Sequence, residues 1–277
     1  ISILYEQLAK ATTDESRLSI QKQINQQALK ASKYGLPNEF DKLLKSIGST
    51  GINATTSYDR TTYYNSFPAH EMEKWLDIYS TRFRNPVFRS FQSELEVVYE
   101  EKNRSMDNFE RRIGEQVFKH LFPNSPYGQW SVLGITDHLK NPSLLKMYEF
   151  FEKYYVSENM ALVLSGNFKS GEVKPLISKT FKDFRTGSVV KEALPVIRPF
   201  DGIEKFNARI TPAKVGFTGY QTVSATHHDR AVLDFYEYML SNNSNTGLFN
   251  QLMQNNEMMY SGTIPLQYDD AGGFVFY

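Results

Sequence analysis

Hydrophobic and polar positions follow two different periods along the chain, and each period predicts a kind of element. Positions 5–32 are mostly polar with widely spaced leucines and isoleucines, which indicates one or two polar helices broken near Thr12 to Asp14. A further helix is predicted from Pro37 to Gly48, because proline favours the first turn of a helix and glycine favours its end. The first part of the chain is therefore expected to be helical.

The next part switches to a strand pattern and then returns to a helical one. The runs Gly51 to Ser57 and Thr61 to Phe67 are short and β-prone, with a turn between them, so they predict a hairpin. Pro68 is expected to begin a helix that ends before Pro86. One long helical stretch is then predicted from about Arg89 to Leu121.

Turn signals and apolar runs organise the middle of the chain. Pro126-Tyr127-Gly128 predicts a turn, and Asn141 is expected to cap a helix that has Pro142 at its first position. The apolar run Met160 to Ser165 is expected to be a strand buried on both faces. Thr186 to Pro199 has the composition of a linker.

Beyond this linker the order of elements loosely repeats. The predicted elements are a strand at Lys214 to Tyr220, helices at Asp229 to Leu240 and Gly247 to Gln254, and a hairpin at Met259 to Tyr277. A helix followed by a hairpin is also predicted at 38–67, which suggests a second, similar repeat. Because strands and helices alternate, the predicted fold class is α/β or α+β, with a sheet covered by helices.

Length and composition limit the possible partners. A chain of 277 residues favours two units over one, and we expect a helical arm or insertion at 1–36, a first unit at 37–188, and a linker with the truncated start of a second repeat at 189–277. The formal net charge is zero, so no excess of basic residues points to nucleic acid. No apolar run approaches the roughly 20 residues that span a bilayer. The absence of cysteine excludes disulfides, iron–sulfur clusters and thiol catalysis, while the compartment stays open between the cell envelope and the cytoplasm.

The most informative chemistry is a pair of glutamates. Glu94 and Glu101 are seven residues apart, so on a helix both carboxylates project from one face. Val97 and Val98 lie between them, and an ionised carboxylate on such a partly apolar seam needs a cation or hydrogen-bond donors nearby. A metal ion is one candidate. The alternative is a solvated acidic helix with i,i+4 ion pairs such as that of Glu100 with Arg104.

Several segments taken together resemble the insulinase/pitrilysin family of inverted-motif zinc peptidases, which also includes the mitochondrial processing peptidases. The matching segments, in the order of the family, are Gly51 to Ser57 (GINATTS), Arg82 to Pro86, Val97 to Glu101 with Asp107-Asn108 behind it, Pro126 to Gly128, and Tyr154-Tyr155 through Asn159-Met160 to Gly166. The resemblance covers Asn38 to about Phe184 well and the remainder weakly. It implies an α/β roll of the metallopeptidase type.

The resemblance also implies site residues and a cofactor. In the family, two histidines and a glutamate from an H-x-x-E-H helix make the catalytic centre, and a distant glutamate is the third Zn²⁺ ligand. By that match Glu101 is expected to bind the metal. Glu94 is expected to stabilise the metal ligands without binding the metal itself. The strand with Asn53, Ala54 and Thr55 corresponds to the edge that pairs with a peptide substrate.

The chain departs from the family pattern at the motif itself. Residues 1–277 contain no H-x-x-E-H, and the closest approach is His70-Glu71-Met72-Glu73-Lys74, in which a cation replaces the second histidine. We interpret His70 as a surface residue, and His227 with His228 as a pair at a helix N-terminus. The motif is expected upstream of Ile1, so both histidines and the catalytic base would lie there.

Two functions follow as hypotheses. The first is a fragment of a zinc metalloendopeptidase that acts on peptides or unfolded proteins, with the chain alone expected to bind zinc poorly and to be inactive. The alternative is a non-catalytic peptide-binding or scaffold subunit of the same fold, with homo- or hetero-association of halves possible in either case. The presence or absence of H-x-x-E-H upstream separates the two.

Overall fold

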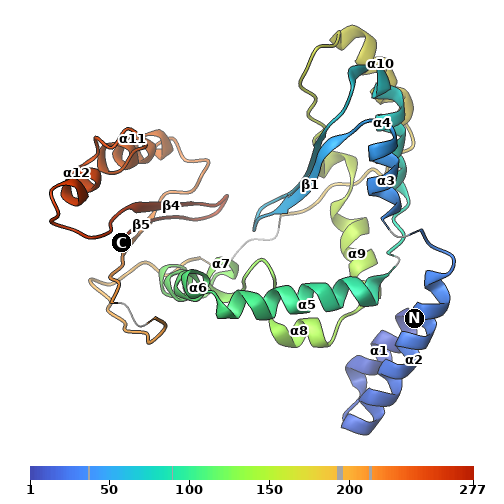
Figure 1. The fold of residues 1–277 in the computed structure, drawn as a ribbon, viewed down its shortest axis with the longest axis horizontal. Coiled ribbons are helices and arrows are strands. Elements are labelled where there is room, and N and C mark those ends of the chain that lie inside the picture. The colour runs from blue at the N-terminus through green and yellow to red at the C-terminus, as the bar shows by residue number, and fades with distance from the viewer. Residues whose placement is uncertain (37, 89, 192–195, 212–213) are drawn as a thin grey trace. The chain divides into compact units, whose positions relative to one another are not determined.

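The computed structural model describes residues 1–36, 38–88, 90–191, 196–211 and 214–277 (Figure 1). The chain divides into two compact units. Unit 1 comprises Ile1–Thr56, Thr61–Tyr99 and Thr136–Glu192, and unit 2 comprises Ser57–Arg60, Glu100–Ile135 and Ala193–Tyr277. The division falls within one helix, α5 (Phe91–Asp107), between Tyr99 and Glu100.

Unit 1 is mostly helical around one hairpin. Its elements are α1 (Ser2–Lys10), α2 (Asp14–Ser32), α3 (Glu39–Ser46), β1 (Thr50–Thr56), β2 (Thr61–Ser66), the 3₁₀ turn η1 (Ala69–Glu71), α4 (Met72–Arg84), the first part of α5, α8 (Thr136–Lys140), α9 (Leu144–Tyr154), the 3₁₀ turn η2 (Ser157–Asn159) and α10 (Ser170–Thr180). The predicted break between the first two helices is confirmed, with Thr13 as the N-cap of α2. The predicted hairpin and the helix after it are confirmed as β1, β2 and α4.

The core of unit 1 forms where α3 and α4 pack near the hairpin. Leu44, Trp75, Leu76, Tyr79 and Phe83 are buried in one cluster. The apolar positions of α4 recur at helical spacing, so one face of the helix enters this cluster. The side chain of Asn65 on β2 accepts hydrogen bonds from Trp75 Nε1 (3.1 Å) and the Tyr79 hydroxyl (2.8 Å), which satisfies the polar atoms of both rings.

The helical arm α1–α2 has a small core of its own within unit 1. Tyr5, Leu8 and Ile24 are buried together with Leu144 at the start of α9. The Tyr5 hydroxyl donates to Gln92 Oε1 on α5 at 2.6 Å. Burial, with a smaller contribution from the charge of Glu96, raises the pKa of Tyr5 to about 12.

Unit 2 contains the second part of α5, a three-stranded sheet and four further helices among the described residues. These elements are α6 (Phe109–Leu121), α7 (Pro126–Gln129), β3 (Thr218–Thr222), α11 (Arg230–Leu240), α12 (Leu248–Gln254), β4 (Thr263–Gln267) and β5 (Gly272–Phe276). All strand pairs are antiparallel in the order β3-β5-β4, so β5 is central. The helix-then-hairpin order predicted for this region is confirmed by α12, β4 and β5.

Close packing in unit 2 explains a glycine at the centre of its sheet. A Cβ atom on Gly273 of β5 would lie 2.6 Å from Leu121 Cδ2 and 3.2 Å from Phe122 Cζ. Leu121 and Phe122 end α6 and are almost fully buried. Glycine at 273 therefore lets the end of α6 approach the sheet.

Two sequence predictions about elements are wrong. The run Met160 to Ser165 is not assigned as a strand, and Val163 is 84% exposed, because the described residues provide no neighbouring strand to pair with it. The long helix predicted from Arg89 to Leu121 is broken at Asn108, which has an extended backbone and accepts a side-chain hydrogen bond from Arg111 N (2.9 Å). Asparagine at this position therefore ends one helix and caps the next.

Three element boundaries also differ from the prediction. Ser143, not Asn141, caps α9, since its hydroxyl accepts from Lys146 N at 3.1 Å. Pro126-Tyr127-Gly128 lies in the short helix α7 instead of a turn. β3 begins at Thr218, four positions after the predicted start at Lys214.

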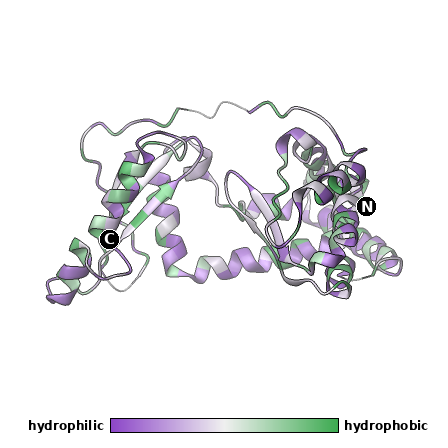
Figure 2. Cartoon of the chain, turned by 90° about the horizontal axis from the view of Figure 1, so that it is seen from above, coloured by the Kyte–Doolittle hydropathy of each residue, from purple (hydrophilic) through white to green (hydrophobic). Residues whose placement is uncertain are grey.

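The described helices are all amphipathic or polar. In Figure 2 hydrophilic and hydrophobic residues are interspersed along them, and no helix is hydrophobic throughout its length. Among the described residues, none of the helices combines the length and hydropathy needed to cross a membrane.

Candidate functional site

Helix α5 carries the glutamate pair, and its buried side is regular. Phe91, Leu95, Val98, Lys102 and Ser105 are partly or fully buried and recur at spacings of four and three residues, which is one helical stripe. The partly buried Gln92 and Tyr99 lie beside this stripe. The helical conformation of this segment was predicted correctly, although its end at Asp107 was not. The apolar seam was not, because Val97 is 58% exposed.

Glu94 and Glu101 lie outside this stripe and are exposed. Among the residues that the structure describes, neither carboxylate has an ion-pair partner. Glu100 does have one, since its Oε2 lies 3.6 Å from Arg104 Nη2 on the solvent side of the helix. The acidic helix thus combines one i,i+4 surface ion pair, as the solvated-helix alternative expects, with two unpaired acids.

The residue after Glu101 was missed by sequence reasoning. Lys102 is buried, with 8% of its side chain exposed, and its ammonium lies 3.3 Å from Glu115 Oε1 and 3.0 Å from Ser131 Oγ. Its signal in the sequence was the four-and-three spacing from Leu95 and Val98, which places a lysine on the buried stripe.

The predicted substrate edge lies on β1. In the described part of the chain β1 pairs with β2 alone, so its other edge has no strand beside it. Asn53, Ala54 and Thr55 are exposed and oppose Tyr64, Tyr63 and Thr62 of β2 in register. The backbone N–H of Ala54 donates to the side chain of its own neighbour Asn53, at 2.8 Å from Oδ1.

The predicted site residues are shared between the two units. Asn53, Ala54 and Thr55 are consecutive on β1 in unit 1, and Glu94 is also in unit 1. Glu101 belongs to unit 2. The three strand residues therefore lie together on β1, and both glutamates lie on α5.

The segment most similar to the family's motif does not offer a second ligand. The side chain of His70 is 80% exposed, which agrees with its interpretation as a surface histidine. Lys74 Nζ forms an ion pair with Glu71 Oε2 at 2.8 Å. Position 74 therefore has an ammonium group, already paired with Glu71, where the motif needs a histidine.

One group of three metal-ligating side chains does lie close together in the described residues. It consists of His227, His228 and Asp229 at the start of α11, with ligand atoms within 4.8 Å of one another and all three residues exposed. His228 Nε2 lies 3.3 Å from Asp229 Oδ1, and His227 Nδ1 accepts from Asp229 N at 3.2 Å.

Zn²⁺ in a catalytic site needs three protein ligands and an open position. The group at His227 does not include Glu101, and no histidine belongs to a ligand group with Glu101 among the described residues. The described residues therefore do not fit zinc at Glu101 by themselves. One exposed, unpaired carboxylate is what this chain can contribute to such a centre.

Comparison with protein-family models identifies two matches that together cover most of the chain. Residues 26–130 match "Insulinase (Peptidase family M16)", and residues 143–277 match "Peptidase M16 inactive domain". The first match includes β1 and all of α5, and hence every predicted site residue.

Individual relatives have names that agree with the family. A zinc protease PqqE of Helicobacter pylori is 25% identical over 261 residues, which is 89% of this chain and 57% of the relative. A probable mitochondrial-processing peptidase subunit beta of Arabidopsis thaliana is 25% identical over 161 residues, 55% of this chain and 29% of that relative. A crystal structure of a protease from Helicobacter pylori has a TM-score of 0.69 at 22% identity, covering 86% of this chain and 59% of the other. The chain thus spans little more than half the length of the first of these relatives.

Proposed function

Since the chain belongs to the insulinase family of peptidases, family M16, we propose that it is part of a zinc-dependent metalloendopeptidase that hydrolyses peptides or unfolded proteins. The zinc protease names of relatives support this reaction class. The single observation that carries the proposal is the state of Glu101. It is an exposed carboxylate without an ion-pair partner in the described residues, on a helix with a well-defined buried side.

Glu101 is the proposed zinc ligand contributed by this chain, and Glu94 a supporting carboxylate two helical turns earlier. A surface carboxylate with no local partner can bind a metal without first breaking an ion pair. Glu100 is less suitable, because its carboxylate already pairs with Arg104. The two histidines and the base of an H-x-x-E-H helix would come from outside residues 1–277.

Strand β1 is the proposed binding edge for the substrate backbone. A peptide could extend the two-stranded sheet by pairing along Asn53, Ala54 and Thr55. The hydrogen bond from Ala54 N–H to the Asn53 side chain supports this role, since it satisfies an edge donor locally and can be exchanged for a peptide carbonyl. Without the motif, residues 1–277 alone are proposed to hydrolyse nothing.

The experiment assays the full-length protein with an internally quenched peptide, with and without a zinc chelator. Hydrolysis that stops with chelator and returns with added Zn²⁺ is expected. Glu101→Gln should abolish it, Glu94→Gln should lower it by about 10-fold to 100-fold, and Glu100→Gln should leave it unchanged as the matched control. Undiminished hydrolysis by the Glu101→Gln protein overturns the ligand role.

A second candidate function is a non-catalytic subunit that binds peptides through the same strand. The match of residues 143–277 to the M16 inactive domain favours it. It predicts that the full-length protein binds an unlabelled peptide but does not cleave it, alone or mixed with a catalytic half.

A further inference from the structure

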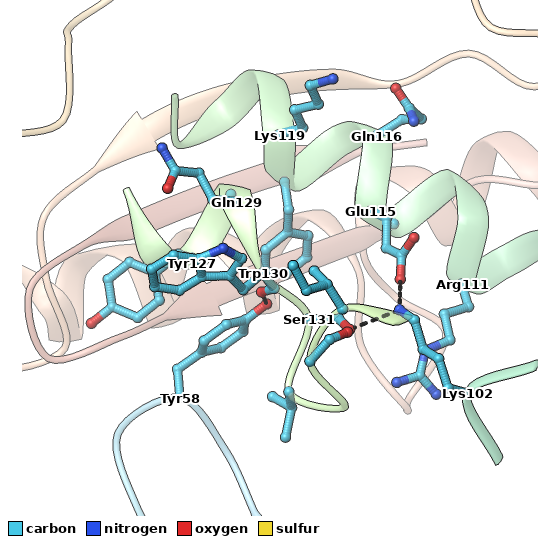
Figure 3. A pocket seen from close by; sticks show the side chains of 16 residues that line it. Tyr58, Lys102, Arg111, Glu115, Gln116, Lys119, Tyr127, Gln129, Trp130 and Ser131 are labelled. Atoms are coloured by element: carbon cyan, nitrogen blue, oxygen red, sulfur yellow. Dashed lines mark hydrogen bonds and ion pairs between the residues drawn. The ribbon is translucent and has the colours of Figure 1, made fainter. Parts of the chain in front are cut away.

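Unit 2 contains a pocket that lies outside the predicted zinc and substrate residues. Its volume is about 390 Å³, and all of its lining residues belong to unit 2, from the start of α6 to the loop after α7 together with Tyr58 and Lys102 (Figure 3). This volume is within the usual range for small-ligand sites and suits one or two amino-acid side chains.

More positively than negatively charged side chains line the pocket. Lys102, Arg111 and Lys119 line it, against the single carboxylate of Glu115. Glu115 is also the partner of the Lys102 ammonium, so its charge is already compensated. Arg111 and Lys119 have no ion-pair partner in the described residues, which leaves an excess of positive charge facing the pocket.

Lys102 gives this site a preorganised cation. Its side chain is 8% exposed, and Glu115 Oε1 and Ser131 Oγ account for two of its three ammonium hydrogens. Ser131 is itself held by donating to Gly134 O at 3.1 Å, so the hydroxyl that accepts from the ammonium is fixed in place. Figure 3 shows the Arg111 side chain next to that of Lys102.

Aromatic rings complete the walls. The Tyr58 hydroxyl donates to the backbone oxygen of Trp130 at 2.7 Å, which ties two lining residues together. Trp130 lines the pocket and is 50% exposed, so its ring is not fully covered by the protein. A ligand that combines an anion with an adjoining apolar or planar group matches both kinds of wall.

We propose that this pocket binds a carboxylate carried by a peptide, either an Asp or Glu side chain or a C-terminal carboxylate. The unpaired guanidinium of Arg111 can donate two parallel hydrogen bonds to a carboxylate, and the Lys102 ammonium supplies a third donor. The choice of a peptide as the carrier rests on the proposed function. The choice of a carboxylate rests on the pocket alone.

The test uses the fluorescence of Trp130 in residues 1–277. Trp75→Phe removes the other tryptophan of the chain, which lies in the core of unit 1. Three acetylated tetrapeptides serve as probes: Ala-Ala-Glu-Ala amide, Ala-Ala-Gln-Ala amide, and Ala-Ala-Gln-Ala with a free C-terminus. A saturable change in Trp130 fluorescence is expected with the glutamate peptide or with the peptide that has a free C-terminus. The uncharged Ala-Ala-Gln-Ala amide should bind at least about 10-fold more weakly, because it lacks the charge-assisted hydrogen bond.

The first and third peptides distinguish the two sources of the carboxylate. Arg111→Gln is expected to reduce the tighter of these two affinities by about 10-fold or more. Arg112→Gln is the matched control, because it makes the same charge change on the next residue of α6, which does not line the pocket.

Equal affinity for all three peptides, no saturable change with any of them, or equal losses in the Arg111→Gln and Arg112→Gln proteins would overturn the proposal. The measurement needs neither zinc nor hydrolysis. If the peptides do not bind but the full-length protein is an active peptidase, only the pocket proposal is overturned. If a carboxylate peptide binds but the full-length protein cleaves no peptide, only the peptidase proposal is overturned.

Discussion

Two neighbouring residues of α5, Glu101 and Lys102, carry charges that differ in burial and in their partners. Lys102 is buried, and its ammonium is held by a carboxylate and a hydroxyl. Glu101 is exposed, and among the described residues it has no ion-pair partner. A rotation of about 100° around the helix axis separates the two side chains.

This difference in burial and partners implies that the charge of Lys102 contributes to the stability of the fold, whereas the charge of Glu101 does not. A buried ammonium requires its acceptors, so Lys102, Glu115 and Ser131 form a unit whose loss costs stability. An exposed carboxylate without a partner contributes little to stability, and its position is therefore free to serve a ligand. The comparison makes specific predictions for changes on either side of α5.

The largest effect is expected on the buried side. Lys102→Met leaves the Glu115 carboxylate without its cation, and we expect a loss of about 2 kcal/mol in the free energy of unfolding of unit 2. The loss is smaller than for a fully buried pair because the Glu115 side chain is 34% exposed and can be hydrated. Urea unfolding followed by Trp130 fluorescence in the Trp75→Phe background measures it.

Glu101→Gln in the same background is the matched control for that measurement. We expect its free energy of unfolding to stay within about 0.5 kcal/mol of the parent protein. Similar losses in the two variants would contradict the contrast between the two sides of α5.

An intermediate loss of stability is expected from a change at Asn108, where α5 ends and α6 begins. Asn108→Ala removes the side-chain acceptor that holds the first turn of α6, so unit 2 should lose about 1 kcal/mol in its free energy of unfolding. Asn108→Asp keeps an acceptor and is the control. An alanine variant as stable as the aspartate variant would mean that the cap does not define the break between α5 and α6.

The smallest effect is expected for the surface ion pair on the exposed side. Glu100 and Arg104 side chains are 68% and 82% exposed, so water screens their attraction. Glu100→Gln should change the free energy of unfolding by less than about 0.5 kcal/mol, and 1 M salt should remove even that difference. A loss equal to that of Lys102→Met would show that exposure on α5 is a poor guide to energetic cost.

Local signals made much of the fold predictable. The hairpin of β1 and β2, the break between α1 and α2 and the ends of α4 all follow from turn, cap and proline residues that act within a few positions. The helical placement of Glu94 and Glu101 was predictable for the same reason, and so was the family.

The remaining features depend on distant contacts. The apolar run at 160–165 indicates a buried strand only if other strands flank it, which the run itself does not encode. Asn141 and Ser143 both favour an N-cap, and the choice of Ser143 depends on where α9 packs. The spacing of Lys102 from Leu95 and Val98 indicates a buried position, but the acceptors Glu115 and Ser131 that hold its ammonium are revealed only by the structure.

The central claim, that Glu101 is the zinc ligand contributed by this chain, is tested most directly by the metal content of the full-length protein. Purified protein is dialysed against graded zinc buffers, and bound zinc is measured for the parent, Glu101→Gln and Glu100→Gln. The parent and Glu100→Gln proteins should retain about one zinc ion per chain at the same free concentration. Glu101→Gln should need at least about 100-fold more free zinc, and equal retention by all three proteins would contradict the assignment.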